Sequence, residues 1–104
     1  MLVHAKNDHR AILDMMKEEK IIMSRVFDKD HKHVGYIMGR KDEDGKLRIG
    51  WSKCTKGDKF DRALGMRIAY RRTYVYVDAF KDVPYCVRDT YEQFVDRCKK
   101  YFKV

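Results

Sequence analysis

Three short β-rich segments joined by turn-forming residues are the feature that most constrains how this chain can fold. Residues 20–28 are rich in β-formers, and residues 33–40 and 46–52 alternate between apolar and other side chains. The first two segments are joined by a turn at residues 28–30, and the last two by a hairpin loop at residues 42–45. Links this short join neighbouring antiparallel strands, so the sequence predicts a three-stranded antiparallel meander.

The alternation also predicts which side chains share a face of this sheet. One face of the second strand holds Val34, Tyr36 and Met38. On the third strand, one face holds Leu47, Ile49 and Trp51, and the other holds Arg48, Gly50 and Ser52. In the loop between these strands, Gly45 is suited to a positive φ.

Two helices are predicted from capping residues followed by apolar side chains at helical spacing. The first covers residues 7–19, where Asn7 or Asp8 is the cap and Ile12, Leu13 and Met16 recur. The second begins at Asp58 and ends near Arg72, with Phe60, Leu64 and Ile68 as its buried stripe. In this helix Gly65 and Ala69 form a small-residue ridge that another element could approach closely.

A third helix near the C-terminus is predicted from an apolar stripe that follows the helical period closely. Asp89 or Thr90 is its expected cap, and its stripe comprises Tyr91, Phe94, Val95, Cys98, Tyr101 and Phe102. Residues 73–77 are β-branched and aromatic, which favours a fourth strand over a distorted continuation of the second helix. The fold class is therefore α+β: an N-terminal helix, a three-stranded antiparallel meander and two C-terminal helices, in a single domain over residues 1–104.

Composition narrows the cellular setting and the class of activity. Of 104 residues 44% are hydrophobic, enough for a core, and no apolar run approaches the about 20 residues that a membrane span needs. No signal peptide is visible at the N-terminus, and the three cysteines are an odd number without a CxxC pair. These features favour a cytoplasmic protein with reduced thiols, in which Cys86 and Cys98 serve as small core residues.

Positive charge is concentrated in one segment. The chain has 24 basic and 16 acidic residues, a net charge of +8, and residues 51–74 alone have seven basic against two acidic residues. Clustered like charges produce the long-range field that attracts an acidic partner, although a solvated basic helix without a partner has the same composition. Arginine and tyrosine side chains also dominate protein-binding surfaces. The candidate binding residues are Lys53, Lys56, Lys59, Arg62, Arg67, Arg71, Arg72, Tyr70 and Tyr74.

Two other kinds of chemistry have weaker support. His31 and His33 would lie on one face of a strand, but no further ligand motif accompanies them, so neither a metal nor another cofactor is expected. Cys54 follows a predicted strand and lies near Lys53 and Lys56, where its thiol pKa could be lowered. No base stands near it in the sequence, so a structural thiol is the preferred interpretation and no enzymatic activity is predicted.

A set of residues in the C-terminal half resembles a pattern found in small bacteriophage proteins of the early type, most of them uncharacterised. The matching residues are Ile49-Gly50-Trp51-Ser52-Lys53-Cys54, Asp58, Phe60, Gly65, Ile68-Ala69, Arg72, Val83-Pro84, Tyr91, Phe94, Arg97-Cys98 and Tyr101-Phe102. The resemblance covers residues 46–103, and a glycine commonly stands where this chain has Arg71. It implies a phage protein acting in the cytoplasm of an infected bacterium, and it carries no catalytic residues with it.

Charge and resemblance together predict a non-enzymatic binding protein with no membrane association. The first hypothesis is an acidic host target that is a nucleic acid or a nucleic-acid-bound complex. The alternative is a protein-directed inhibitor of a bacterial host or defence complex, comparable to an anti-CRISPR protein. A third possibility is an enzyme that uses Cys54.

Overall fold

The computed structural model describes residue 14 and residues 20–54, 59–75 and 84–103. Within these ranges the elements are β1 (Ile22–Phe27), β2 (His33–Lys41), β3 (Leu47–Trp51), α2 (Arg62–Val75) and α3 (Tyr85–Phe102). The strands form one antiparallel sheet in the order β1-β2-β3, so the α+β class and the meander are confirmed. The predicted N-terminal helix lies outside the described residues except for Asp14, and both described helices follow the strands.

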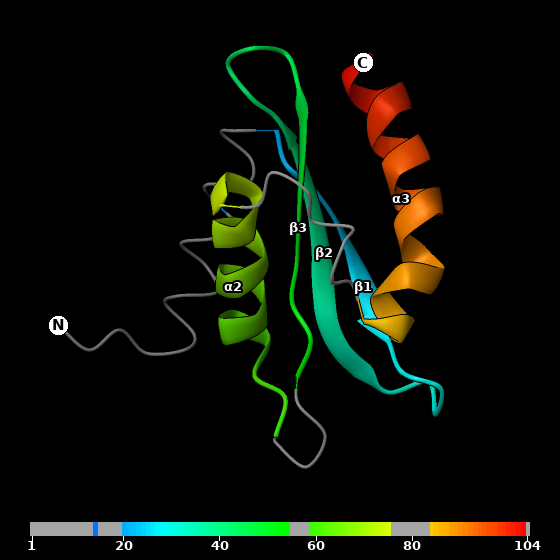
Figure 1. Cartoon of the computed structure of the whole chain (residues 1–104). Helices are drawn as coiled ribbons and strands as arrows, with labels where there is room; N and C mark the ends of the chain where they lie inside the picture. Colours follow the sequence, from blue (N-terminus) through cyan, green and yellow to red (C-terminus); the bar gives the residue numbers. More distant parts are fainter. Residues whose placement is uncertain (1–13, 15–19, 55–58, 76–83, 104) are drawn as a thin grey trace, which may run out of the picture.

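The two helices cover opposite faces of this sheet, giving three layers (Figure 1). In each of the two turns that join the strands, an aspartate side chain accepts backbone hydrogen bonds and so fixes the register of the strands. Asp28 accepts backbone hydrogen bonds from Asp30 and Lys32 at 2.9 and 3.0 Å. In the β2–β3 loop, the Asp42 side chain accepts backbone hydrogen bonds from Asp44 and Lys46 at 2.9 and 2.8 Å. Gly45 in the same loop has a φ of 80°, as its sequence position predicts. Short-range turn chemistry therefore determines the meander.

An irregularity in the β1–β2 ladder changes the face of one predicted core residue. Val26 pairs with Gly35 whereas Phe27 pairs with His33, so Val34 is passed over. Tyr36 pairs normally and packs on the α2 side, but Val34 packs against the α3-side cluster. The prediction that Val34 shares a face with Tyr36 and Met38 is wrong, because one extra residue in a strand reverses the alternation.

Helix α3 covers a core of large apolar side chains. The buried members of this cluster are Ile22, Val26, Ile37, Ile49, Trp51, Cys86, Val87, Phe94 and Cys98. The predicted stripe is confirmed at Phe94 and Cys98, whereas Tyr101 is 57% exposed. Burial of Cys86 and Cys98 confirms them as core residues, and burial raises the pKa of the Cys98 thiol to about 12.

The start of α3 differs from the predicted one. The helix begins at Tyr85, and the carbonyl of Pro84 accepts hydrogen bonds from the amides of Val87 and Arg88. Proline is well suited to the beginning of a helix because its φ is already helical and it has no amide hydrogen that needs a partner. Asp89, the expected cap, therefore lies inside the helix.

Helix α2 packs on the sheet through small residues instead of the predicted stripe. Its cap is Asp61, whose Oδ1 accepts a hydrogen bond from the Leu64 amide at 3.1 Å. The buried residues on its sheet-facing side are Ala63, Gly65, Met66, Ala69 and Thr73, which confirms the small-residue ridge. Leu64 is 43% exposed, and Phe60 and Ile68 are half-buried, so the stripe prediction is wrong.

Gly50 explains which side of α2 faces the sheet. A Cβ at Gly50 would overlap the backbone of Ala69 and Thr73, so the helix axis lies very close to β3. Only the side of the helix with the smallest side chains permits that approach. The large residues Leu64 and Ile68 are consequently turned away from the sheet.

The predicted strand at residues 73–77 is wrong for its first three residues, because α2 continues to Val75. Thr73 is fully buried against the sheet. Its hydroxyl donates to the Tyr70 carbonyl at 2.6 Å and accepts from Arg40 Nε at 3.1 Å. Tertiary contacts therefore override the β propensity of this segment. Residues 76 and 77 lie outside the described ranges.

Candidate functional site

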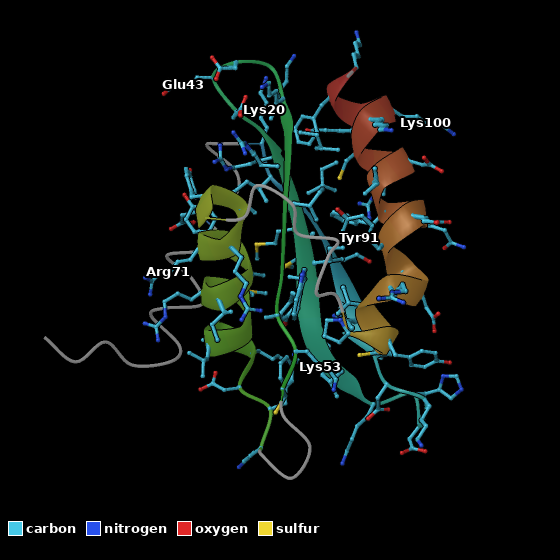
Figure 2. The ribbon with its side chains drawn as sticks, in the orientation of Figure 1. Lys20, Glu43, Lys53, Arg71, Tyr91 and Lys100 are labelled. Atoms are coloured by element: carbon cyan, nitrogen blue, oxygen red, sulfur yellow. The ribbon has the colours of Figure 1, made fainter. Side chains whose placement is uncertain are left out.

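The exposed cations of the basic segment lie at the β3–α2 junction and on the outer side of α2. Lys53, Lys59, Arg62, Arg67 and Arg71 are all exposed, and Figure 2 shows Arg71 pointing away from the sheet. We call these five residues the basic face. Lys56 lies outside the described residues.

Arg67 and Arg71 lie on a different side of α2 from the one that the predicted stripe implies. With Phe60, Leu64 and Ile68 buried, Arg67 would lie on the flank of the stripe and Arg71 nearly in line with it. The buried side is centred on Met66, Ala69 and Thr73 instead, which places Arg67 and Arg71 on the solvent side.

Arg72 has a different environment from the other basic residues of α2. Its Nη1 donates a hydrogen bond to the Trp51 carbonyl at 2.8 Å, and its guanidinium carbon lies 4.6 Å from the centroid of the Trp51 ring. Arg72 therefore fastens α2 to the end of β3. A structural role accounts for this residue, which had been a candidate for binding.

Tyr70 and Tyr74 form an aromatic pair near the end of α2. Their rings are 5.4 Å apart in an edge-to-face arrangement, and their hydroxyls are 3.2 Å apart. The Arg40 guanidinium lies 3.6 Å from the centroid of the Tyr74 ring, and its Nη2 donates to the Thr73 carbonyl at 3.3 Å. The sequence analysis missed Arg40, although the alternation of β2 places it on the same face as Met38.

A pocket of about 460 Å³ lies between the end of β3 and the beginning of α2. Its lining combines apolar walls with two lysines, a carboxylate and a thiol: Ser52, Lys53, Cys54, Lys59, Phe60, Asp61, Leu64, Gly65 and Ile68. The sequence analysis missed this pocket because it assigned Phe60, Leu64 and Ile68 to the core. The sequence did contain a signal for the pocket. Phe60, Leu64 and Ile68 recur at helical spacing and follow Lys53 and Cys54 closely in the chain.

Hydrogen bonds to β2 fix the strand side of this pocket. The Ser52 amide donates to the Tyr36 carbonyl at 2.8 Å, and the Cys54 amide donates to the Val34 carbonyl at 2.6 Å. The Ser52 hydroxyl also accepts from the Tyr36 amide at 3.2 Å. The half-buried Cys54 is thus held at the pocket by its own backbone.

His33 lies behind the pocket in a group of aromatic rings. Its ring is 4.6 Å from that of Phe60 and 4.8 Å from that of Tyr36. Nε2 donates to the Gly35 carbonyl at 2.9 Å, and Nδ1 is buried without a hydrogen-bond partner among the described residues. Burial lowers the pKa of His33, and the positive charges of Arg25 and Arg62 lower it further against the opposing effect of the Gly35 hydrogen bond.

No group of three or more His, Cys, Asp or Glu side chains in the described part of the chain could hold a metal ion. Neither described helix is long and apolar enough to span a bilayer. Comparison with protein-family models, curated proteins and solved structures gave no significant match. Function must therefore be inferred from the residues and their geometry.

Proposed function

We propose that this domain is a non-enzymatic protein that binds a nucleic acid, or a complex containing one, through the basic face. The observation that carries the proposal is the exposure of Lys53, Lys59, Arg62, Arg67 and Arg71 on and beside one helix. Asp61 is the one acidic residue among the described residues of this segment, and its Oδ1 caps α2. A nucleic acid presents closely spaced phosphate groups, which such a cluster attracts strongly.

The rigidity of the helix strengthens this proposal. Arg72 and the buried Thr73 fasten the last turns of α2 to β3 and β2. The exposed arginines therefore project from a helix whose position is fixed, and fewer conformations are lost on binding. Following the phage resemblance, the expected setting is the cytoplasm of an infected bacterium.

Charge reversal on matched sites tests the proposal. The double variant Arg67→Glu/Arg71→Glu changes the basic face, and Lys99→Glu/Lys100→Glu makes the same change in net charge on α3. Both lysines are exposed in the last turns of α3, on the other side of the sheet. Arg72 is left unchanged because its loss would weaken the contact between α2 and β3.

Fluorescence anisotropy with single-stranded DNA, duplex DNA and RNA provides the measurement, after circular dichroism has shown a native fold. We expect the α2 variant to lose at least about tenfold in affinity and the slope of log K against log salt to fall by about two. The α3 variant should retain most of the affinity. Equal losses would mean that overall charge alone matters, and failure of the unaltered protein to bind any of the three at about 50 mM salt would reject the proposal.

The partly apolar pocket beside the basic face favours a second candidate, a protein-directed inhibitor of a host or defence complex. Tyrosine and arginine are enriched in protein-binding surfaces, and here Tyr74 is exposed near arginines while the exposed Leu64 adds apolar surface. Affinity capture from a nuclease-treated bacterial lysate distinguishes the two candidates. One stoichiometric protein partner that survives nuclease, and is lost with Leu64→Glu, would favour this function.

A further inference from the structure

The pocket at the start of α2 is continuous with the basic face, because Lys53 and Lys59 belong to both. We infer that this pocket accepts one unstacked nucleobase from a single-stranded nucleic acid whose backbone follows α2. The inference rests on the proposed function and adds to it a preference for single strands.

The size and walls of the pocket suit a planar, mostly apolar group. Its volume of about 460 Å³ is within the usual range for small-ligand pockets, roughly 300–1,000 Å³. Leu64 and Ile68 supply aliphatic surface, and the half-buried Phe60 supplies an aromatic ring. Every base can stack on an aromatic ring, and this contact is a common way to hold single strands.

The charges at the pocket suit phosphates beside a neutral group. Lys53 and Lys59 are exposed and attract phosphates, and the lining also includes the carboxylate of Asp61, which is exposed as well. Near that carboxylate a phosphate or an acidic side chain is repelled. A nucleobase is uncharged, and its N–H groups, which include the ring N–H of thymine, can donate hydrogen bonds to a carboxylate.

The outward arginines fit a backbone that leaves the pocket along the helix. Arg67 and Arg71 are four residues apart, a rise of about 6 Å, and both are exposed on the same side of α2. They follow the lining residues Leu64 and Ile68 by three positions each, so they are neighbours of the pocket on the helix surface. In a duplex the bases are stacked and paired, so entry of one base would require extrusion. A single strand does not have that cost.

Comparison with a strand that lacks bases distinguishes binding by base insertion from binding by charge attraction alone. The probes are a labelled oligothymidine of 12 nucleotides and an oligomer of equal length with tetrahydrofuran in place of every base, both at about 50 mM salt. We expect the thymidine strand to bind at least about tenfold more tightly than the abasic strand. Equal binding would overturn the inference and leave the proposed function standing. Absence of binding to both strands, to duplex DNA and to RNA would overturn both.

Alkylation of Cys54 then locates the base. Cys54 is half-buried in the pocket, whereas Cys86 and Cys98 are only 7% and 0% exposed, so N-ethylmaleimide should modify Cys54 selectively. Oligothymidine should slow this alkylation, followed by mass spectrometry, at least fivefold, and the abasic strand at matched occupancy should not. The alkylated protein should lose its preference for thymidine over abasic strands but keep its salt dependence. Cys54→Ser treated with the same reagent should keep both.

Two results would show that the pocket has another occupant. A preference for thymidine that persists after complete alkylation would overturn the inference. So would protection of Cys54 by a glutamate-rich peptide centred on tryptophan when no oligonucleotide protects it, because that result assigns the pocket to a protein partner.

Discussion

Helices α2 and α3 cover opposite faces of the same sheet, but they pack through different kinds of residue. The α3 face is filled by large apolar side chains such as Ile37, Phe94 and Trp51. The α2 face is narrow, with Ala69 and Thr73 against Gly50, and hydrogen bonds from Arg40 and Arg72 reinforce it. Most of the large buried apolar side chains therefore lie on the α3 face, whereas α2 leaves large and basic side chains exposed.

The largest expected effect is on the α3 face. Phe94 is 2% exposed in the core, so Phe94→Ala should lower the free energy of unfolding by about 3–5 kcal/mol. Leu64→Ala on the outer side of α2 should change it by about 0.5 kcal/mol or less. Urea denaturation followed by circular dichroism measures both. Similar losses from the two variants would contradict the placement of Phe94 in the core and of Leu64 on the outer side of α2.

A smaller but still clear loss is expected where α2 approaches the sheet. Gly50→Ala adds a Cβ that must displace the backbone of Ala69 and Thr73, so we expect a loss of about 1–3 kcal/mol. Fluorescence of Trp51 should change with it, because Arg72 stacks on that ring. If Gly50→Ala were as stable as the unaltered protein, the close approach of α2 would be wrong.

The polar reinforcement of α2 can be tested with an isosteric change. Thr73→Val removes the hydroxyl that donates to the Tyr70 carbonyl and accepts from Arg40 Nε. We expect a loss of about 1–2 kcal/mol in urea denaturation, because a donor of Arg40 loses its partner. Ser24→Ala in β1, half-buried, serves as a control for loss of a hydroxyl and should have the smaller effect.

The smallest expected effect is on the pH dependence of the free energy of unfolding, through His33 on the α2 face. The pKa of His33 in the folded protein is below the ordinary 6.5, so the unfolded chain takes up more protons as the pH falls through that value. The contribution to stability should be complete above about pH 6.5 and should decline as the pH falls toward the folded-state pKa. The free energies of unfolding measured by urea denaturation at pH 7.5 and 5.5 should differ less in His33→Gln than in the unaltered protein. An equal difference would exclude His33 as the source.

Local sequence determined the strands, the turns and most of α3. Asp28, Asp42 and Gly45 act within their own turns, so their effect is visible without the rest of the chain. The concentration of cations in residues 51–74 was likewise apparent from the sequence, and the structure shows five of them exposed. The start of α3 was the main local error, because Pro84 supplies a helix start that competes with Asp89.

Tertiary structure decided what α2 buries and what it exposes. Its sequence contains two stripes at helical spacing, one through Phe60, Leu64 and Ile68 and one through Met66, Ala69 and Thr73. Periodicity gives the angles between side chains around a helix axis, but it does not fix the rotation of the whole helix against its neighbour. The absence of a side chain at Gly50 fixes that rotation, because it lets the smaller stripe approach β3 more closely than the larger one could. The pocket and the outward arginines follow from this contact between residues that are distant in the sequence.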